Sequence, residues 1–172
     1  MNLETKGILE AVIARLKENP QRARGTRRIT AEWVGGMACE VRIGNRVVIT
    51  DEGRSLGGTE RGPDPASLPL AGLASCTATA FVLMSALMEI PIESVEVSVT
   101  ADLDLRGSLG AEEGVPSGYT DIRYEARIKS SASDERIREL AAAAERMCPV
   151  HDTLTRPHRI TGELSLNGRP LS

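Results

Sequence analysis

The sequence predicts an α+β domain with a mainly antiparallel sheet and a buried central helix. Short segments in which apolar and polar residues alternate occur on both sides of one long uncharged segment, residues 65–88. These strand-like segments follow one another in groups and do not alternate regularly with helices, which argues against a parallel βαβ sheet. The expected order is three strands, a helix, two strands, a helix and a last strand.

Composition and charge narrow the class of protein. The 172 residues are 41% hydrophobic and 26% charged, which excludes a disordered chain and allows one domain with a sizeable core. The net charge is −3, so the chain lacks the basic field that is typical of nucleic-acid binding. One Trp, two Tyr and one Phe offer few rings for stacking bases. We therefore expect no nucleic-acid partner.

An amphipathic helix is predicted over residues 4–18, where apolar side chains recur at helical spacing: Leu9, Val12, Ile13 and Leu16. Residues 21–28 carry four arginines and are interpreted as a solvated linker, with a clamp for an acidic group as the alternative. The chain is thus divided into residues 1–28, the N-terminal amphipathic helix and Arg-rich linker, and residues 29–172, the main domain.

Three short strands are expected at the start of the main domain. Alternation holds in residues 29–33, 39–43 and 47–50, with a glycine-containing turn between each pair, so the segment predicts an antiparallel meander. Residues 51–67 are rich in Gly, Pro and charge and are predicted to form a loop. Such loops often carry functional residues.

The uncharged segment 65–88 raises the question of a membrane span, for which roughly 20 apolar residues are needed. Pro69, Gly72 and several Ser and Thr residues dilute its hydrophobicity. A helix that is apolar on all sides is also typical of the centre of a globular domain. We therefore predict a buried helix and no membrane partner.

Two strands and a second long helix are expected after this segment. Alternation returns in residues 95–106 and 122–128, with a glycine-rich loop over 107–118 between them. Ser and Asp residues just before position 135 can cap a helix over 135–147. A last strand is placed near the C-terminus by three apolar residues: Ile160, Leu164 and Leu166.

The cysteine count and the N-terminus predict a reducing, cytoplasmic location. Three cysteines are too few, and odd in number, for a secreted disulfide framework. The N-terminal segment carries charges throughout and has no signal-peptide core.

Cys76 and Cys148 are the candidate reactive thiols. Cys76 lies in the segment LASCTATA, among small residues that leave room at the sulfur. Cys148 lies in RMCPVHDTL, where Pro149 must end one helix or begin another. Near a helix boundary, free amides and the helix dipole can lower the pKa of a thiol. The alternative from chemistry alone is that both are small core residues, since free cysteine is among the most buried residue types.

Cys39 and His151 are given structural interpretations. Cys39 lies in an alternating strand without a partner motif and is predicted to be inert core. Cys148 and His151 have the spacing of half a zinc site, but no second pair of ligands accompanies them, so no metal is expected. His151 is instead expected to cap a helix end or to tune Cys148. No nucleophile-elbow motif supports Ser-His-Asp chemistry.

Two cysteine segments, LPLAGLASCTATA and MCPVHDTL, resemble those of the OsmC/Ohr family of thiol-dependent hydroperoxide reductases. The resemblance covers residues 29–168 and includes the order of the elements. It implies an intertwined homodimer with two active sites at the subunit interface. It also implies that Cys76 is the peroxidatic and Cys148 the resolving cysteine of a disulfide that an external dithiol or lipoyl-type reductant opens. The implied substrate is an organic hydroperoxide, and no metal or organic cofactor is implied.

The sequence departs from the family pattern at a carboxylate. Better-characterised members have a Glu nine or ten positions before the first cysteine, where this chain has Ser67 and Ala66. Glu60 and Asp64 in the preceding loop are possible substitutes. A loop carboxylate is more often a solvated charge or a helix cap, and Asp64, just before Pro65, is well placed to be a cap.

The family also uses an arginine that holds the thiolate and the peroxide. Arg42 on a strand and Arg61 in the loop are equally ranked candidates for this role, and Arg54 is also compatible by position. The predicted site consists of five residues: Cys76, Cys148, Arg42, Arg61 and Glu60.

Three functions follow from these patterns. The leading hypothesis is a cytoplasmic, homodimeric thiol peroxidase that acts on organic hydroperoxides. The alternative is a catalytically weakened family member that holds a small apolar ligand at the dimer interface, which Ala66 and Ser67 favour. The third is an interaction protein that binds an acidic partner through the basic segment 22–28.

Overall fold

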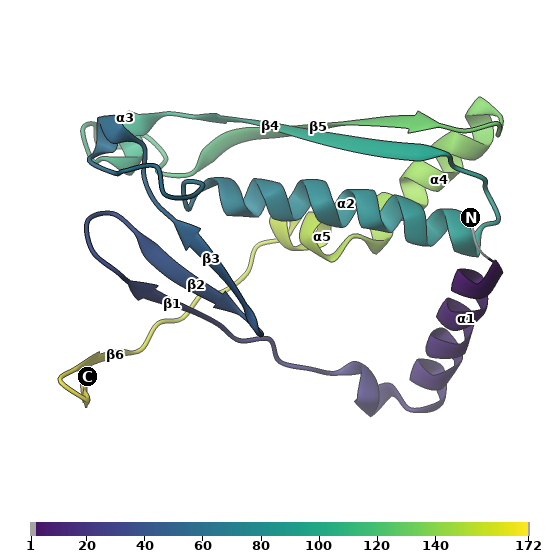
Figure 1. Ribbon diagram of the computed structural model, residues 1–172, viewed down its shortest axis with the longest axis horizontal. Helices are drawn as coiled ribbons and strands as arrows, with labels where there is room; N and C mark the ends of the chain where they lie inside the picture. Colours follow the sequence, from purple (N-terminus) through teal and green to yellow (C-terminus); the bar gives the residue numbers. More distant parts are fainter. Residues whose placement is uncertain (1–2, 172) are drawn as a thin grey trace.

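A long helix, α2 (Ser67–Leu87), lies in the middle of the chain, and the other elements are arranged around it (Figure 1). The computed structural model describes residues 3–171, and only the backbone of residues 3 and 4. All strand pairs in this part of the chain are antiparallel, and they form three sheets with the orders β1-β2-β3, β4-β5 and β6-β7. The α+β class with antiparallel pairing is therefore confirmed, with three small sheets in place of one.

The predicted meander is present as three strands: β1 (Ile29–Trp33), β2 (Cys39–Ile43) and β3 (Arg46–Thr50). Val41 in the middle strand lies opposite Ala31 on one side and Val48 on the other. Gly44 has a φ of 61° in the tight turn between β2 and β3, a conformation that residues with a Cβ rarely adopt. All five residues of β1 are exposed, so this sheet presents an uncovered surface within the single chain.

The central helix α2 buries one of its faces. The buried side chains recur at helical spacing: Leu73, Thr77, Ala80, Phe81, Ser85 and Ala86. Ala71 and Val82, on the same helix, are exposed, so burial of the whole helix is not confirmed within one chain. At the start of α2, the Asp64 carboxylate accepts a hydrogen bond from the Ser67 amide at 3.0 Å, which confirms its predicted role as a cap.

Length and composition alone would allow α2 to cross a membrane, and among the helices of residues 3–171 this holds only for α2. A core helix of a globular domain can have the same composition. The helix contacts β4, α4 and α5, and its buried face contributes side chains to the core of the chain. One face of α2 therefore packs within the chain.

β4 (Ser94–Leu103) and β5 (Tyr119–Lys129) form a long antiparallel pair that runs along α2 (Figure 1). Alternate residues of β4 are half-buried, beginning with Val95, because one face of the pair packs on α2. Val97 lies opposite Ala126 in this pair. The alternation in the sequence therefore predicted the buried face correctly.

The prediction that the strand continues through Arg106 is wrong. β4 ends at Leu103, and a short helix, α3 (Leu105–Ser108), follows it. The Asp104 side chain accepts a hydrogen bond from the Arg106 amide at 3.0 Å and so caps this helix. A local bond of this kind stabilises a turn in competition with the extended chain.

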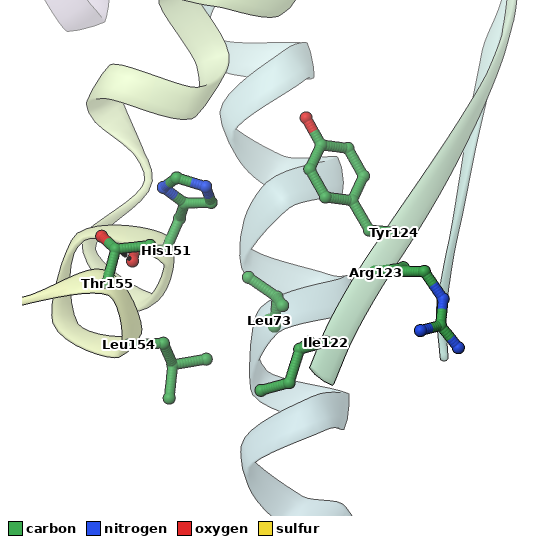
Figure 2. Close-up of a pocket in the computed structure, with 7 residues that line it drawn as sticks. All are labelled: Leu73, Ile122, Arg123, Tyr124, His151, Leu154 and Thr155. Carbon is green, nitrogen blue, oxygen red and sulfur yellow. Dashed lines mark hydrogen bonds between the residues drawn. The ribbon is translucent and has the colours of Figure 1, made fainter. Parts of the chain in front are cut away.

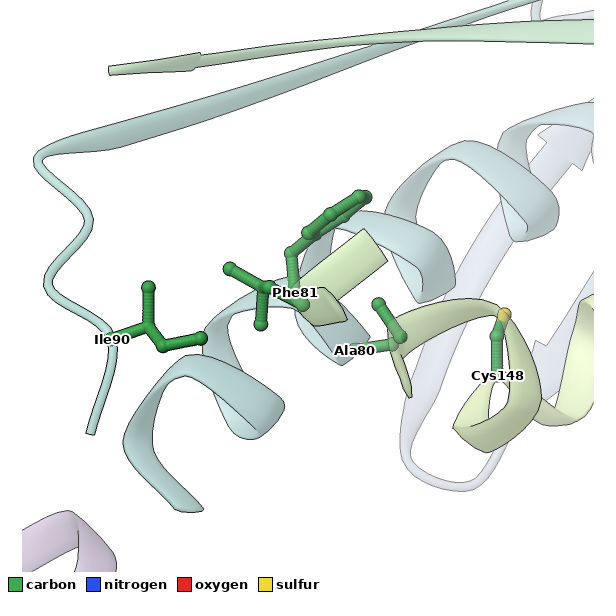
Figure 3. Packing of buried hydrophobic residues seen from close by; sticks show 6 residues of the cluster. Ala80, Phe81, Ile90 and Cys148 are labelled. Carbon is green, nitrogen blue, oxygen red and sulfur yellow. The ribbon is translucent and has the colours of Figure 1, made fainter. Parts of the chain in front are cut away.

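Two consecutive helices, α4 (Asp134–Met147) and α5 (Pro149–Thr155), pack against α2 (Figure 1). Ser133 caps α4 by accepting a hydrogen bond from the Arg136 amide, as its sequence predicted. Only Cys148 separates the two helices. The buried core cluster extends from this junction, at Cys148, to Ile90 beyond the C-terminal end of α2 (Figure 3), and it has six members: Ala80, Phe81, Ile90, Leu140, Ala144 and Cys148.

The N-terminal helix α1 (Leu3–Glu18) is confirmed and contacts the C-terminal end of α2 (Figure 1). Lys6 Nζ and Glu89 Oε1 form an ion pair of 2.7 Å at this contact. The apolar stripe of α1 stays 37–59% exposed at four positions: Ile8, Val12, Ile13 and Leu16. A short 3-10 helix, η1 (Pro20–Ala23), follows, and residues 19–28 are exposed throughout. The division of the chain at residue 28 stays a prediction.

The C-terminal strand prediction is correct in part. β6 (Leu164–Leu166) pairs with a further strand, β7 (Arg169–Leu171), which the pattern analysis did not include. Asn167 and Gly168 connect them with φ values of 53° and 78°, the conformation of a two-residue hairpin turn. Ile160 lies outside the strand and is 94% exposed.

Candidate active site

Cys76 and Cys148 meet where α2 contacts the start of α5. Cys76 lies beside the buried face of α2 and is half-buried, whereas Cys148 is fully buried in the core cluster. Both cysteines are free, and their thiols interact directly. The structure therefore brings together the two residues that the sequence singles out as reactive.

Cys148 caps the N-terminus of α5. Its backbone is extended, and Pro149 takes the first position of the helix, where no amide hydrogen is needed. The Cys148 sulfur accepts a hydrogen bond from the His151 amide at 3.4 Å. The Val150 amide interacts with both sulfurs. The Cys-Pro dipeptide thus turns the chain so that the first amides of α5 face the thiol pair.

Thr77 contacts Cys148 from the other side. Its Oγ1 lies 3.7 Å from the Cys148 sulfur, and either atom can be the donor. Thr77 is only 1% exposed and directly follows Cys76 in α2. One turn of α2 therefore carries both the half-buried thiol and a buried hydroxyl that contacts its partner.

The two thiols have pKa values shifted in opposite directions. Burial alone would raise the pKa of Cys148, but four donors together lower it: the His151 amide, the Thr77 hydroxyl, the Cys76 thiol and the Val150 amide. For Cys76, burial raises the pKa, the Val150 amide opposes this, and the interaction with Cys148 adds to the rise. The donors around Cys148 therefore favour negative charge on its sulfur over negative charge on the sulfur of Cys76.

A cavity of about 220 Å³ opens one helical turn from the thiol pair, between α2, β5 and α5 (Figure 2). Leu73, Ile122 and Leu154 supply its apolar walls, and the rings of Tyr124 and His151 lie at one end. The cavity can hold a compact apolar group next to two polar side chains.

A tyrosine-carboxylate pair lies close to Cys148. The Tyr124 hydroxyl donates a hydrogen bond to the Glu145 carboxylate. Burial, followed by the bond and charge of Glu145 and the charge of Cys148, raises the pKa of Tyr124 well above its ordinary value. Tyr124 therefore stays protonated and places a neutral hydroxyl near the thiol pair.

The arginines and the glutamate predicted for the site interact with residues other than the two cysteines. Glu60 forms an ion pair of 3.0 Å with Arg54, and Arg42 on β2 pairs with Glu40. Arg61 is exposed and donates its backbone amide to Asp51. None of the interactions of Cys76 described above involves these side chains, so their site roles stay predictions.

The loop that carries these residues is organised by a buried carboxylate, Asp51. One carboxylate oxygen accepts three hydrogen bonds, from the Thr59 amide (2.9 Å), the Thr59 hydroxyl (2.7 Å) and the Arg61 amide (3.3 Å). The other oxygen accepts the Glu52 amide at 2.9 Å. The loop also packs closely on β3, since a Cβ at Gly62 would lie 1.9 Å from the Ile49 carbonyl oxygen. Asp51 thus fixes the segment that presents Arg54, Glu60 and Arg61.

Changing Asp51 to Asn is expected to lower the thermal midpoint by about 5 °C at neutral pH, because an amide cannot accept all four bonds. The Thr59 hydroxyl, first among its donors, lowers the pKa of Asp51 below its ordinary 3.8. The carboxylate therefore stabilises the fold at higher pH, and this contribution is lost as the pH falls through the lowered pKa. Thermal melts at neutral pH and at about pH 3 should show the difference between wild type and variant shrinking on acidification.

Asp121→Asn is the matched control, since Asp121 is exposed and paired with Arg123 on the sheet surface. An equal loss of stability in both variants at neutral pH would contradict the role assigned to Asp51.

A larger apolar groove of about 680 Å³ opens at the N-terminal end of α2. Its walls include six large apolar side chains: Met37, Leu56, Leu70, Leu103, Leu105 and Leu109. Ala66 and Ser67, the two positions where the resemblance implies a Glu, line the same groove, and so do the carboxylate residues Glu52 and Asp64. The Tyr119 hydroxyl donates to the Ala66 carbonyl at 2.8 Å and ties this turn to β5.

The remaining predicted residues have the following places. Cys39 is half-buried in β2, opposite Trp33 and Thr50, and does not belong to the core cluster. His151 meets the thiol pair through its backbone amide, and its ring lines the smaller cavity. Within residues 3–171, no three His, Cys, Asp or Glu side chains form a group able to hold a metal ion.

Three contributors to the site were missed by sequence reasoning: Thr77, the Tyr124-Glu145 pair and Asp51. Thr77 could have been noticed, because it shares a helical turn with Cys76. The other two depend on how the chain folds back on itself, over 8 and 10 residues at Asp51 and over 21 residues between Tyr124 and Glu145, and side-chain periodicity does not predict such contacts.

Known proteins support the fold and the family. The model of the OsmC-like protein family matches residues 57–163, more than half of the chain. No curated protein matches the chain. Similar solved structures include an OsmC like protein from Mycoplasma pneumoniae, with 22% identity and a TM-score of 0.66 over 76% of this chain and 87% of that chain.

Two further structures are named as organic hydroperoxide resistance proteins. The one from Legionella pneumophila has 22% identity and a TM-score of 0.59 over 76% of this chain and 90% of that chain. The putative one from Vibrio cholerae, with captopril bound in one of its active sites, has 18% identity and a TM-score of 0.55 over 86% and 96%. Such identities establish the shared fold alone. Since the family match spans more than half of its length, the chain belongs to the OsmC-like protein family.

Proposed function

We propose that this protein reduces organic hydroperoxides through the thiols of Cys76 and Cys148. The observation that carries the proposal is the contact between two free thiols at the first amides of α5. The names of the relatives from Legionella pneumophila and Vibrio cholerae, which describe organic hydroperoxide resistance, favour the same chemistry. The smaller cavity offers an apolar place for the organic group of the substrate.

The proposed reaction balances with one peroxide and two thiols. The Cys76 thiolate attacks the distal peroxide oxygen, the O–O bond breaks, the alcohol leaves with a proton, and Cys76 becomes a sulfenic acid. The Cys148 sulfur then attacks the Cys76 sulfur, a disulfide forms, and the hydroxyl leaves as water. A dithiol or lipoyl-type reductant of the cytoplasm restores both thiols by exchange. The scheme uses no metal or organic cofactor.

The first step is expected to be slow in this protein. Cys76 must be ionised to attack, yet burial raises its pKa and Cys148 holds the negative charge first. The two thiols share one proton, so a Cys76 thiolate forms when that proton moves to Cys148. Arg42 and Arg61 are our candidates for a cation that favours this state and orients the peroxide. A misplacement of about 1 Å in such a group can reduce the rate roughly 100-fold.

A peroxide-consumption assay with an organic hydroperoxide and a dithiol reductant tests the proposal. We expect slow but measurable consumption by the wild type and none above background by Cys76→Ser. Cys39→Ser is the matched control, because Cys39 is half-buried and lies in β2 outside the thiol pair. The proposal fails if Cys76→Ser and Cys39→Ser consume peroxide at the same rate.

We further propose that the working molecule is a homodimer. Three apolar surfaces are uncovered within one chain: the outer face of α2, the strand β1 and the stripe on α1. Obligate homodimers typically bury upwards of about 2,000 Å² of apolar surface of this kind. A second copy could also supply Arg42 from its exposed sheet.

Sedimentation at micromolar concentration is expected to show a dimer, and deletion of residues 1–18 should weaken it and lower the stability. A stable monomer at that concentration would contradict the proposal. Comparison of the full chain with the deletion separates the contribution of α1 from that of α2 and β1.

A second candidate function is the binding of a small apolar ligand. The groove at the start of α2 favours it, because Ala66 and Ser67 contribute an apolar and a small polar side chain where a family carboxylate is expected. Two results would favour this function over peroxide reduction. The wild type would consume no peroxide, and it would bind an apolar fluorescent probe that the Leu70→Glu variant, altered in the groove, does not bind.

A further inference from the structure

The buried hydroxyl of Thr77 differs in its partner from the hydroxyls of Ser75 and Thr79 on the same helix. Ser75 and Thr79 donate to helix carbonyl oxygens four residues earlier, at 2.8 and 2.9 Å. Thr77 instead contacts the Cys148 sulfur, 71 residues away in the sequence, and it is only 1% exposed. A buried hydroxyl needs a partner, and here that partner is one atom of the thiol pair.

We propose that Thr77 is a positioning residue for the resolving step: its hydroxyl holds the Cys148 sulfur towards Cys76 and donates to that sulfur when it is ionised. The inference deepens the proposed function and rests on it for its role in turnover. In this role the Thr77 hydroxyl affects the rate of disulfide formation, although it does not itself react.

Two groups contact the Cys148 sulfur from opposite elements. The His151 amide donates from the start of α5, and the Thr77 hydroxyl approaches from α2 at 3.7 Å. Threonine is well suited to this because its branched side chain has few rotamers in a helix. Thr77 and Cys76 are neighbours on one rigid helix, so the contact sets the position of Cys148 relative to the thiol that it must reach.

The Thr77 hydroxyl can form a hydrogen bond with Cys148 in either protonation state of the cysteine. When Cys148 is a thiol, its proton can point to Thr77 Oγ1, and when Cys148 is a thiolate, the hydroxyl can donate to the sulfur. Hydrogen bonds to a charged group are stronger than those to a neutral one, so the hydroxyl favours the thiolate. This agrees with the lowered pKa of Cys148, to which Thr77 contributes.

Other titratable groups face Cys148 and must be considered with Thr77. The Cys76 thiol approaches from α2, the Tyr124 hydroxyl from β5, and Glu145 lies on α4 with its carboxylate bound to Tyr124. On α5, the His151 backbone meets the sulfur. Because Tyr124 stays protonated, the thiolate of Cys148 is stabilised by neutral donors only, and the loss of one of them should be measurable.

In the resolving step the Cys148 thiolate supplies an electron pair to the Cys76 sulfur of the sulfenic acid. The S–S bond forms, the S–O bond breaks, and the departing hydroxide takes a proton to become water. Loss of the hydroxyl should slow this step, because less of Cys148 is ionised and its sulfur is no longer held towards Cys76. It should not slow the attack on the peroxide, because a smaller share of the negative charge on Cys148 leaves more of it on Cys76.

The first measurement is a thiolate titration followed by ultraviolet absorbance in a chain with Cys39→Ser and Cys76→Ser, where Cys148 is the only thiol. In this background Thr77→Val should raise the titration midpoint by about one unit, which is tenfold less thiolate below the midpoint. Thr77→Ser should keep the lower midpoint because it retains the hydroxyl. Thr79→Val is the matched control, since its hydroxyl binds only a helix carbonyl.

The second measurement is a single turnover with an organic hydroperoxide in the chain that keeps all three cysteines. Thr77→Val should slow disulfide formation about tenfold relative to Thr79→Val, while the sulfenic acid should form at least as fast as in Thr79→Val. Melting curves confirm that each variant is folded, and Thr77→Ser shows whether the hydroxyl and not the packing is responsible.

The outcomes separate the two proposals. If Thr77→Val raises the titration midpoint of Cys148 but the protein does not react with peroxide, Thr77 does interact with the Cys148 sulfur and the proposed function is wrong. Equal midpoints in Thr77→Val and Thr79→Val, or a Thr77→Ser variant that titrates like Thr77→Val, would overturn the role assigned to the hydroxyl.

Discussion

Replacement of Cys148 with serine is expected to stop peroxide reduction after a few turnovers, although the first attack by Cys76 should still occur. Without the buried partner sulfur, the sulfenic acid at Cys76 has no thiol beside it, and excess peroxide oxidises it further to the sulfinic acid, which thiols do not reduce. We expect at least about tenfold fewer turnovers than in the wild type. Repeated additions of hydroperoxide, with mass spectrometry of the Cys76 peptide, measure both quantities.

Two comparisons make this prediction specific. Cys39→Ser should complete as many turnovers as the wild type, because Cys39 lies in β2 and is not a member of the core cluster that contains Cys148. If Cys148→Ser sustains turnover with Cys76 unmodified, the reductant resolves the sulfenic acid directly, and the two-cysteine scheme is wrong.

Phe81→Ala is expected to cause the largest loss of stability among single substitutions in this chain. Phe81 is 1% exposed and the largest fully buried side chain, and it packs in the same cluster as Ile90, Leu140 and Cys148. Truncation of a buried Phe to Ala typically costs about 3 to 5 kcal/mol, out of a total that is commonly about 5 to 15 kcal/mol. Chemical denaturation monitored by circular dichroism measures the free energy of unfolding.

Ile160→Ala serves as the control, because Ile160 is 94% exposed and should change the stability by less than about 0.5 kcal/mol. Similar losses in both variants would mean that the cluster around Phe81 does not form the core. Since Cys148 belongs to this cluster, Phe81→Ala should also loosen the thiol pair.

Most elements of the fold could be predicted because their side-chain patterns are strong. The uncharged segment marks α2, and the alternation in β4 marks the face that packs on it. The failure at Leu105 arose because apolar spacing continues past Asp104, whereas a capping bond there begins a helix. The β6-β7 hairpin was missed although Asn167 and Gly168 are a characteristic turn pair, since β7 is short and contains a proline.

The candidate site could be predicted only in its cysteines. Cys76 and Cys148 were recognised from segments that resemble a family, and the turn at Pro149 explains why they can meet. Alternation and helical periodicity tell which face of an element is buried, but not which polar atoms on that face will meet. The contact of Thr77 depends on how α5 docks on α2, and the burial of Asp51 depends on a loop that folds back over eight to ten residues.

The location of the core has a consequence for the order in which a newly made chain can fold. Every member of the core cluster lies between residues 80 and 148, and the side chains packed around it lie between 76 and 150. Synthesis from the N-terminus therefore delivers α1 and the β1-β2-β3 sheet well before the segments that hold the molecule together. During that interval the sheet has two free edges and an exposed β1, which makes it prone to pair with other chains. We therefore expect productive folding to begin once α4 and α5 have left the ribosome and can pack on α2.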